Sequence, residues 1–246
     1  MKSNKRKIRQ TVTETVAKRR AFFELVGVSY AAVIWDMDGL ILDTERLAHE
    51  SWQQCSREFD LNVDDSLFLE IIGMNVDSFH RWLEEHLCDK VDVSALVQRA
   101  NELYQAKIAA GPPIKPGAKA CIEWLSERAI PQAVATSSSQ QLARRKLGHH
   151  DLLPHFKTIA SGDQVSRGKP HPEIFLEAAT RMQVDPRRCL VFEDSRLGVL
   201  GAAAAGATVI LVPDLAVHDS ESEDLALEIW DSLENGPVRF GQWFGL

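Results

Sequence analysis

Long apolar runs and closely spaced cysteines are both missing from this chain of 246 residues. No segment approaches the roughly 18 consecutive apolar residues of a membrane span, and the N-terminal segment lacks the apolar stretch of a signal peptide. The four cysteines are scattered, with no Cys-x-x-Cys spacing among them. We therefore expect a cytoplasmic protein without a membrane partner, whose thiols are buried or half-buried in a reducing compartment.

The chain also lacks an excess of positive charge, since 28 Lys and Arg face 35 Asp and Glu, for a net charge of -7. This balance argues against a nucleic-acid partner for the chain as a whole. Residues 1–29 are the exception, with eight Lys or Arg against two Glu. We interpret them as a solvated basic N-terminal extension, with an arm that binds anions or a membrane surface as the alternative.

Four short apolar runs end abruptly in polar residues, which is typical of strands buried on both faces of a parallel sheet. They cover residues 31–35, 132–135, 189–192 and 208–212. Helical patterns alternate with them over residues 116–129 and 171–183, and a last helix is expected around 223–233. This alternation predicts an α/β fold with a doubly wound parallel sheet, in which ligands bind at the carboxyl ends of the strands.

Residues 46–113 interrupt the alternation with consecutive amphipathic helical patterns and no β-rich run. The chain returns to the sheet through the Gly- and Pro-rich residues 111–117, a natural hinge. The sequence therefore predicts a core domain of residues 30–45 and 114–246. A small helical domain, residues 46–113, is expected to be inserted after the first strand as a lid.

Asp36 and Asp38 stand at i and i+2 directly after the first apolar run, with Gly39 next. Like charges so close together repel each other unless a cation offsets them. A hard divalent ion held by carboxylates, a backbone carbonyl and waters would do so, and Mg²⁺ normally keeps a substrate phosphate among its ligands. On these residues alone, a simple turn or helix cap remains the alternative.

Polar residues at the other strand ends favour the chemical interpretation. Glu193 and Asp194 form a second acidic pair, Thr136 and Ser137 supply hydroxyl and backbone donors at a third strand end, and Lys169 follows a polar loop. Acids for a metal, donors for phosphate oxygens and one ammonium group together make a set suited to phosphoryl transfer.

Four motifs occur in an order that resembles the haloacid dehalogenase (HAD) superfamily. They are Asp-Met-Asp-Gly-Leu-Ile-Leu-Asp-Thr-Glu at 36–45, Ala-Thr-Ser at 135–137, Gly-Lys-Pro at 168–170 and Val-Phe-Glu-Asp-Ser at 191–195. Residues 30–213 resemble its phosphatases with a helical cap, in the subgroup of β-phosphoglucomutase, phosphoglycolate phosphatase and pseudouridine-5'-phosphatase-like enzymes. The resemblance implies a Rossmann-like core with a helical cap domain.

The resemblance also implies a role for each aspartate. Asp36 would attack phosphorus and become an aspartyl phosphate, while Asp38 would protonate the leaving alkoxide and later take a proton from the hydrolytic water. That role requires Asp38 to hold a proton near neutral pH, so we expect its pKa to lie above that of a free aspartate.

The implied ligands fall into two groups. Mg²⁺ would be held by the Asp36 carboxylate, the Asp38 backbone carbonyl and Asp194, with Glu193 beside them. The phosphoryl group and the rest of the substrate would be bound by Thr136, Ser137, Lys169, Gly39 and Asn75. We interpret Asp43 and Thr44 as the N-terminal cap of the next helix, with a part in the flap after the nucleophile as the alternative.

The expected activity is Mg²⁺-dependent hydrolysis of a small phosphorylated metabolite, a sugar phosphate or nucleotide-like monoester, by a monomer or weak dimer. Val76 falls where β-phosphoglucomutase-like members carry an arginine, which counts against a sugar-phosphate mutase. A mutase, or a catalytically weak binding or regulatory protein on the same fold, remains the alternative.

Overall fold

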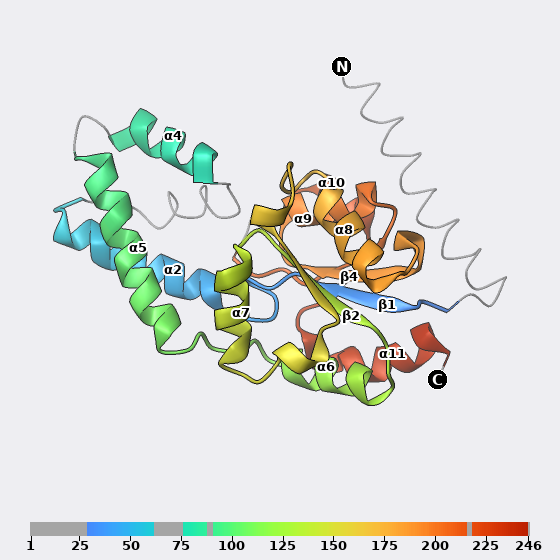
Figure 1. The fold of residues 1–246 in the computed structure, drawn as a ribbon. Helices are drawn as coiled ribbons and strands as arrows, with labels where there is room; N and C mark the ends of the chain where they lie inside the picture. The colour runs from blue at the N-terminus through green and yellow to red at the C-terminus, as the bar shows by residue number, and fades with distance from the viewer. Residues whose placement is uncertain (1–28, 62–75, 88–90, 216–217, 246) are drawn as a thin grey trace, which may run out of the picture.

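A six-stranded parallel sheet forms the centre of the computed structural model (Figure 1). The structure describes residues 29–61, 76–87, 91–215 and 218–245, and for residues 76–80 the backbone alone. The strand order is β3-β2-β1-β4-β5-β6. The strands are β1 (Ala32–Trp35), β2 (Gln132–Thr136), β3 (Thr158–Ser161), β4 (Cys189–Glu193), β5 (Thr208–Leu211) and β6 (Ala226–Ile229). The expected doubly wound α/β fold is confirmed.

Helices cover both faces of this sheet (Figure 1). One layer contains α6 (Ala118–Glu127), α7 (Gln140–Gly148) and α11 (Gly236–Phe244), and the other contains α8 (Glu173–Met182), α9 (Arg196–Ala204) and α10 (Ser220–Leu225). Single turns of 3-10 helix lie at η1 (Leu153–His155), η2 (Gly162–Gln164), η3 (Pro186–Arg188) and η4 (Leu233–Asn235).

Strand β1 shows why the apolar runs are continuous rather than alternating. Successive side chains of a strand point to opposite faces, so Val33 and Trp35 belong to one hydrophobic cluster and Ala32 and Ile34 to the other. Because both faces are covered by helices, all four residues are fully buried. The polar residues after the strand are thereby held at the sheet edge by a rigid support.

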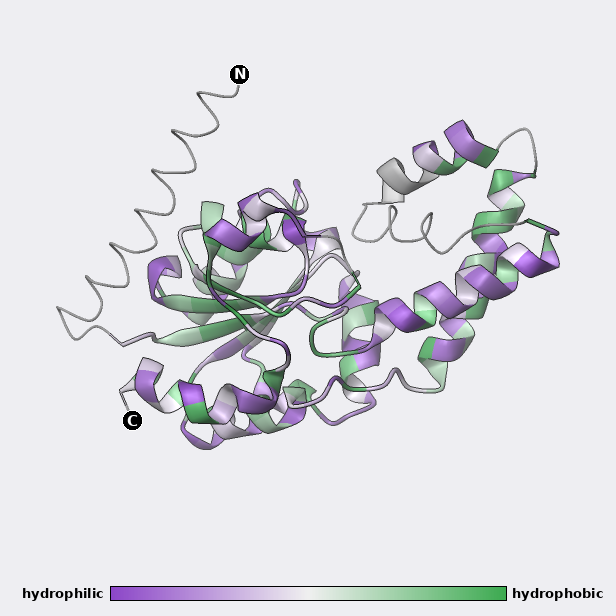
Figure 2. Ribbon diagram, turned by 180° about the vertical axis from the view of Figure 1, so that it is seen from behind, coloured by the Kyte–Doolittle hydropathy of each residue, from purple (hydrophilic) through white to green (hydrophobic). Residues whose placement is uncertain are grey.

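Three helices between β1 and β2 form a separate hydrophobic cluster. They are α2 (Thr44–Glu58), α4 (Val76–Leu87) and α5 (Val93–Ala109), and they extend to one side of the sheet (Figure 1). Their cluster contains the buried residues Trp52, Cys55, Leu83, Leu87 and Leu96. Helices α2 and α5 carry both hydrophilic and hydrophobic residues along their length (Figure 2), as expected for helices that bury one face. No strand occurs among the described residues of 46–113, in agreement with the sequence.

The expected helix at 223–233 is wrong. Helix α10 ends at Leu225, and the chain continues as β6, which pairs in parallel with β5. Ile229 is 50% exposed on this edge strand, so the segment lacks the continuous apolar pattern that identified the central strands. Strand β3 was not predicted either, because a segment of four residues with a polar residue at each end carries little periodic signal.

The described cysteines agree with the expectation for thiols. Cys55, Cys121 and Cys189 are free and buried, while Cys88 lies outside the described residues. Within the described ranges, no helix has the length and apolar character needed to cross a membrane.

Candidate active site

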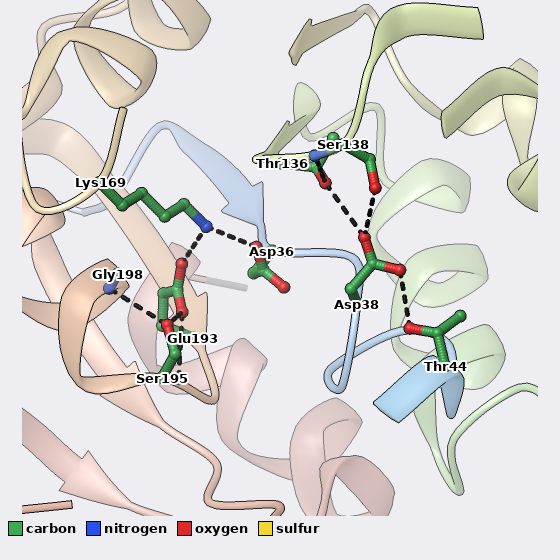
Figure 3. A network of polar contacts seen from close by, with 9 residues as sticks. All are labelled: Asp36, Asp38, Thr44, Thr136, Ser138, Lys169, Glu193, Ser195 and Gly198. Atoms are coloured by element: carbon green, nitrogen blue, oxygen red, sulfur yellow. Dashed lines mark hydrogen bonds and ion pairs between the residues drawn. The ribbon is translucent and has the colours of Figure 1, made fainter. Parts of the chain in front are cut away.

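The carboxyl ends of three adjacent strands bring the predicted residues together. Strand β1 lies between β2 and β4, with Trp35 in register with Val134 and Phe192. Asp36 follows β1, Thr136 ends β2, and Glu193 and Asp194 stand at the end of β4. Lys169 reaches the same place from the loop before α8 (Figure 3).

Asp36, Lys169 and Glu193 form a buried ionic network (Figure 3). The Lys169 Nζ lies 2.5 Å from Asp36 Oδ1 and also forms an ion pair with Glu193 Oε1. The three side chains are 8% or less exposed. Burial raises the pKa of Asp36 well above its ordinary value, and the Lys169 ammonium opposes this. Burial would lower the pKa of Lys169, but Asp36 and Glu193 outweigh it and raise that pKa.

The first turn of α9 fixes the Glu193 carboxylate. Its Oε2 accepts hydrogen bonds from the Ser195 amide at 3.2 Å and the Ser195 hydroxyl at 3.0 Å. The same hydroxyl accepts a hydrogen bond from the Gly198 amide at 3.1 Å, so it also caps the helix. Glu193 is therefore held by both the lysine and the helix N-terminus.

Gly198 leaves the room that the Glu193 carboxylate occupies. A Cβ atom at position 198 would lie 1.9–2.1 Å from the Glu193 carboxyl atoms. We expect Gly198→Ala to displace that carboxylate, to lower kcat about 10²-fold and to cost about 1–3 kcal/mol of unfolding free energy. Steady-state kinetics and thermal unfolding measure both effects. Gly148→Ala is the control, because its Cβ would meet Leu153 at an ordinary 3.7 Å. Equal kinetics of the two variants would contradict this assignment.

Asp36, Glu193 and Asp194 have the composition of a divalent metal site. One carboxylate oxygen of each lies within 4.8 Å of the others. Asp194 Oδ2 is buried and has no hydrogen-bond partner among the described residues. Burial, Asp36 and Glu45 all raise the pKa of Asp194 well above its ordinary value. An oxygen-binding cation would satisfy the unpaired oxygen and offset the crowded negative charge, so the residues fit such an ion.

Gly39 allows Asp194 to approach the first loop. Its φ of +86° favours glycine, and a Cβ there would lie 2.1 Å from Asp194 Oδ2. The Gly39 amide donates a hydrogen bond to the Leu42 carbonyl at 2.9 Å. Because this amide is already paired, the geometry does not support the expected contact between Gly39 and the phosphoryl group. Glu45 lies nearby, and burial together with Asp214 raises its pKa to about 7. The site thus carries more acid than Lys169 alone can balance.

Asp38 belongs to a second network, which points away from the first (Figure 3). Its Oδ1 accepts hydrogen bonds from Lys146 Nζ at 2.6 Å and Thr44 Oγ1 at 2.7 Å. Its Oδ2 accepts one from Ser138 Oγ at 2.8 Å and a longer one from Thr136 Oγ1 at 3.4 Å. The two aspartates of one loop therefore have different partners.

The expected raised pKa of Asp38 is wrong for this state of the site. Burial raises the pKa of Asp38, but the Lys146 ammonium and the hydrogen bonds from Lys146, Thr44 and Ser138 outweigh it and lower that pKa. All of these groups donate to the carboxylate, so they stabilise its ionised form. The sequence interpretation missed Lys146, which supplies the largest opposing effect.

The interpretation of Asp43 and Thr44 as a helix cap is also wrong in its detail. Asp43 occupies the N-cap position of α2, but its side chain makes no capping hydrogen bond. It pairs instead with Arg46 at 2.8 Å, and Arg46 also reaches Asp214 at 3.0 Å. Thr44 binds Asp38, so this segment takes part in the site.

Two predicted residues remain without a structural test. Ser137 is exposed directly after β2, and Asn75 lies outside the described residues. Two residues that the sequence did not identify, Ser138 and Lys146, contact Asp38 directly. Lys146 looks like the end of a solvated basic run, yet it shares the buried face of α7 with residues such as Leu147.

Comparison with known proteins gives a consistent family match. Residues 30–206 match the profile of the family described as haloacid dehalogenase-like hydrolase. A phosphorylated carbohydrates phosphatase of Thermotoga maritima is 34% identical over 175 residues, which cover 71% of this chain and 81% of that protein. A fructose-1-phosphate phosphatase of Escherichia coli is 32% identical over 177 residues, covering 72% of this chain and 93% of that protein.

A solved structure shows similarity at the level of the whole fold. A Thermotoga maritima protein assigned as a β-phosphoglucomutase superimposes with a TM-score of 0.72 at 30% identity. The match covers 86% of this chain and 98% of that one.

Proposed function

The chain belongs to the haloacid dehalogenase-like hydrolase family and is a phosphoric monoester hydrolase, and we propose that Asp36 is its nucleophile and Asp38 its general acid and base. The observation that carries this proposal is the division of the two aspartates between two networks. Asp36 lies beside Lys169 and two further acids, whereas Asp38 lies beside Lys146 and hydroxyl donors. One loop thereby offers two carboxylates with separate partners, so each can take a different role in a two-step reaction.

In the first step, an Asp36 oxygen forms a bond to phosphorus as the bond to the leaving oxygen breaks, and Asp38 gives its proton to that oxygen. In the second step, Asp38 takes a proton from a water whose oxygen bonds to phosphorus as the bond between phosphorus and the Asp36 oxygen breaks, which releases inorganic phosphate and restores Asp36. The Lys146 ammonium and the hydroxyl donors around Asp38 lower its pKa, whereas the negative charge of a bound phosphate raises it and so favours protonation before the first step. Lys169 offsets charge between Asp36 and the phosphoryl oxygens.

We propose that the metal is Mg²⁺, which would be held by the carboxylates of Asp36 and Asp194 and by the Asp38 backbone carbonyl, with Glu193 as a direct or an outer-shell ligand. The buried Asp194 Oδ2, for which the described part of the chain supplies no hydrogen-bond partner, supports this assignment. When bound, the ion supplies positive charge that stabilises the transferring phosphoryl group. Thr136 and the Ser137 amide bind phosphoryl oxygens beside it.

Metal removal is expected to abolish turnover reversibly. EDTA should stop phosphate release, because the acids around Asp36 then lack their counter-ion, and added Mg²⁺ should restore it. Mg²⁺ at about 100 times its Kd should stabilise the fold by about 2.7 kcal/mol, which thermal unfolding measures. Asp194→Asn is the matched variant and should lose most of this stabilisation. Full turnover in EDTA would contradict the metal assignment.

The substrate class follows from the relatives and from the fold. Relatives act on phosphorylated carbohydrates and on fructose-1-phosphate by name, so we propose a small phosphorylated metabolite, a sugar phosphate or nucleotide-like monoester. We propose that residues 46–113 are a cap domain over a core of residues 30–45 and 114–246, with 1–29 as an extension. A phosphomutase is the second candidate, supported by the similar structure assigned as a β-phosphoglucomutase.

The free thiols and the net charge support proposals on location and on the partner. Three buried free cysteines fit a reducing compartment, and we propose a cytoplasmic location. A net charge of -7 supports a small-molecule phosphate ester rather than nucleic acid as the partner. We propose a monomer or weak dimer, which sedimentation can test.

A screen of phosphate esters tests the proposed function. The wild-type protein with Mg²⁺ should release inorganic phosphate from at least one member of a panel of sugar phosphates, nucleotides, short phosphorylated acids and an aryl phosphate. A mutase would instead convert a sugar monophosphate to its isomer in the presence of a sugar bisphosphate. The absence of phosphate release from every compound would favour the binding-protein alternative.

A further inference from the structure

Lys146 is a buried lysine that contacts the aspartate of the second network. Its side chain is 1% exposed, and its Nζ lies 2.6 Å from Asp38 Oδ1 and 3.4 Å from Ser138 Oγ. Lysine is almost never fully buried unless it is paired, because burial of an ammonium group is costly. The packing of α7 alone therefore does not explain a charged side chain at position 146.

The surroundings of Lys146 come from three separate segments of the chain. Asp38 belongs to the loop after β1, and Ser138 to the loop after β2. The Tyr104 ring of α5 lies 5.4 Å from the Lys146 Nζ, and its hydroxyl interacts with Lys146 and with Thr44. The lysine is thus enclosed between the sheet edge and the helices inserted after β1.

We infer that Lys146 is a positioning residue that fixes the orientation of the Asp38 carboxylate for proton transfer to the leaving group. The inference rests on the proposed role of Asp38. Lys169 cannot perform this task, because its Nζ is engaged by Asp36 and Glu193 in the other network.

The geometry explains why one lysine matters among several donors. Thr44, Ser138 and Thr136 bind Asp38 through hydroxyl groups that rotate freely about their C–O bonds. Lys146 adds a charge-assisted hydrogen bond, which is roughly twice as strong as a neutral one. Without it, the carboxylate turns more easily away from the leaving oxygen, and a displacement of about 1 Å can lower a rate about 10²-fold.

The leaving group of the substrate separates positioning from a general structural role. As the bond between phosphorus and an alkyl oxygen breaks, that oxygen needs the Asp38 proton, whereas a dinitrophenolate leaves readily without one. Lys146→Met should therefore slow alcohol release from the alkyl monoester that the wild type hydrolyses fastest by about 10²-fold, and dinitrophenol release from dinitrophenyl phosphate much less. Both are measured in single turnovers with enzyme in excess.

Asp38→Asn and Arg144→Met are the reference variants. Asp38→Asn should show the same preference for the good leaving group more strongly. Arg144 lies exposed on the same helix, so its change to Met removes equal charge and should leave both rates unchanged. If Lys146→Met does not fold, Lys146→Gln replaces it, and dinitrophenol release reports an intact site.

Each outcome distinguishes the inference from the proposed function. A selective loss in both Asp38→Asn and the Lys146 variant supports the inference. If Asp38→Asn slows alcohol release selectively, but the Lys146 variant slows alcohol and dinitrophenol release equally or not at all, the inference is overturned. The proposed function then remains intact. If Asp38→Asn shows no selectivity, the proposed role of Asp38 fails, and the inference fails with it.

Discussion

Asp36→Asn is expected to lower phosphate release by roughly 10⁴-fold or more, since it removes the atom that attacks phosphorus. An amide has the shape of the carboxylate but lacks its nucleophilic oxygen. The two neighbouring acids cannot replace it, because Glu193 is held by Lys169 and Ser195 and Asp194 is placed for the metal. The release of inorganic phosphate under saturating substrate and Mg²⁺ measures this loss.

The same variant should fold at least as well as the wild type in the absence of metal. Burial raises the pKa of Asp36 well above its ordinary value, so an ionised carboxylate is unfavourable at this position and a neutral amide is tolerated. Thermal unfolding in EDTA measures this. Asp185→Asn is the control, because Asp185 pairs with Arg187 at the surface, and it should keep full activity. Near-normal turnover by Asp36→Asn would contradict the assignment of the nucleophile.

Lys169→Met is expected to lower kcat about 10³-fold, because it removes the ammonium group that lies against Asp36 and Glu193. Methionine is similar in length and fills the space beside Phe175, whose ring lies 5.3 Å from the Lys169 Nζ. The lost activity therefore reports lost charge rather than a cavity. Lys157→Met is the matched control, since Lys157 donates to the Met182 carbonyl and not to an acid.

The stability of Lys169→Met should depend on pH. Removing one partner of a buried ion pair costs about 3 kcal/mol at neutral pH in EDTA. Without Lys169 the pKa of Asp36 rises further in the folded state, so the folded protein takes up a proton more readily than the unfolded chain. The loss of unfolding free energy in Lys169→Met is therefore small below about pH 4. It grows as the pH rises through the pKa that Asp36 has in the folded protein. Denaturant unfolding across this range measures it, and a deficit independent of pH would contradict the ionic account.

The central strands could be predicted from the sequence because burial on both faces produces continuous apolar runs. The prediction extended to the site, since parallel strands must place Asp36, Thr136 and Glu193 at one edge. It failed for β6, whose residues are half-exposed at the edge of the sheet and whose pairing with β5 is a long-range contact. Local periodicity carries no record of such a contact.

The pKa of Asp38 could not be predicted because it depends on Lys146, which lies 108 residues away in sequence. An acid–base role suggested a raised pKa, but the folded chain places an ammonium group and several hydroxyl donors against this carboxylate, which lower its pKa. The functions of Ser138 and Thr44 were missed for a related reason, since their hydroxyls are common at turns and helix starts. Only the fold shows that both reach Asp38.

The most direct test of the account is to trap the covalent intermediate. The enzyme is quenched in acid during turnover and treated with borohydride, which reduces an aspartyl phosphate to homoserine, and its peptides are then analysed by mass spectrometry. The account predicts homoserine at position 36 in samples that contain substrate and Mg²⁺, and none in samples without substrate. Homoserine at position 38 or 194, or its absence from an enzyme shown to be turning over, would contradict the account.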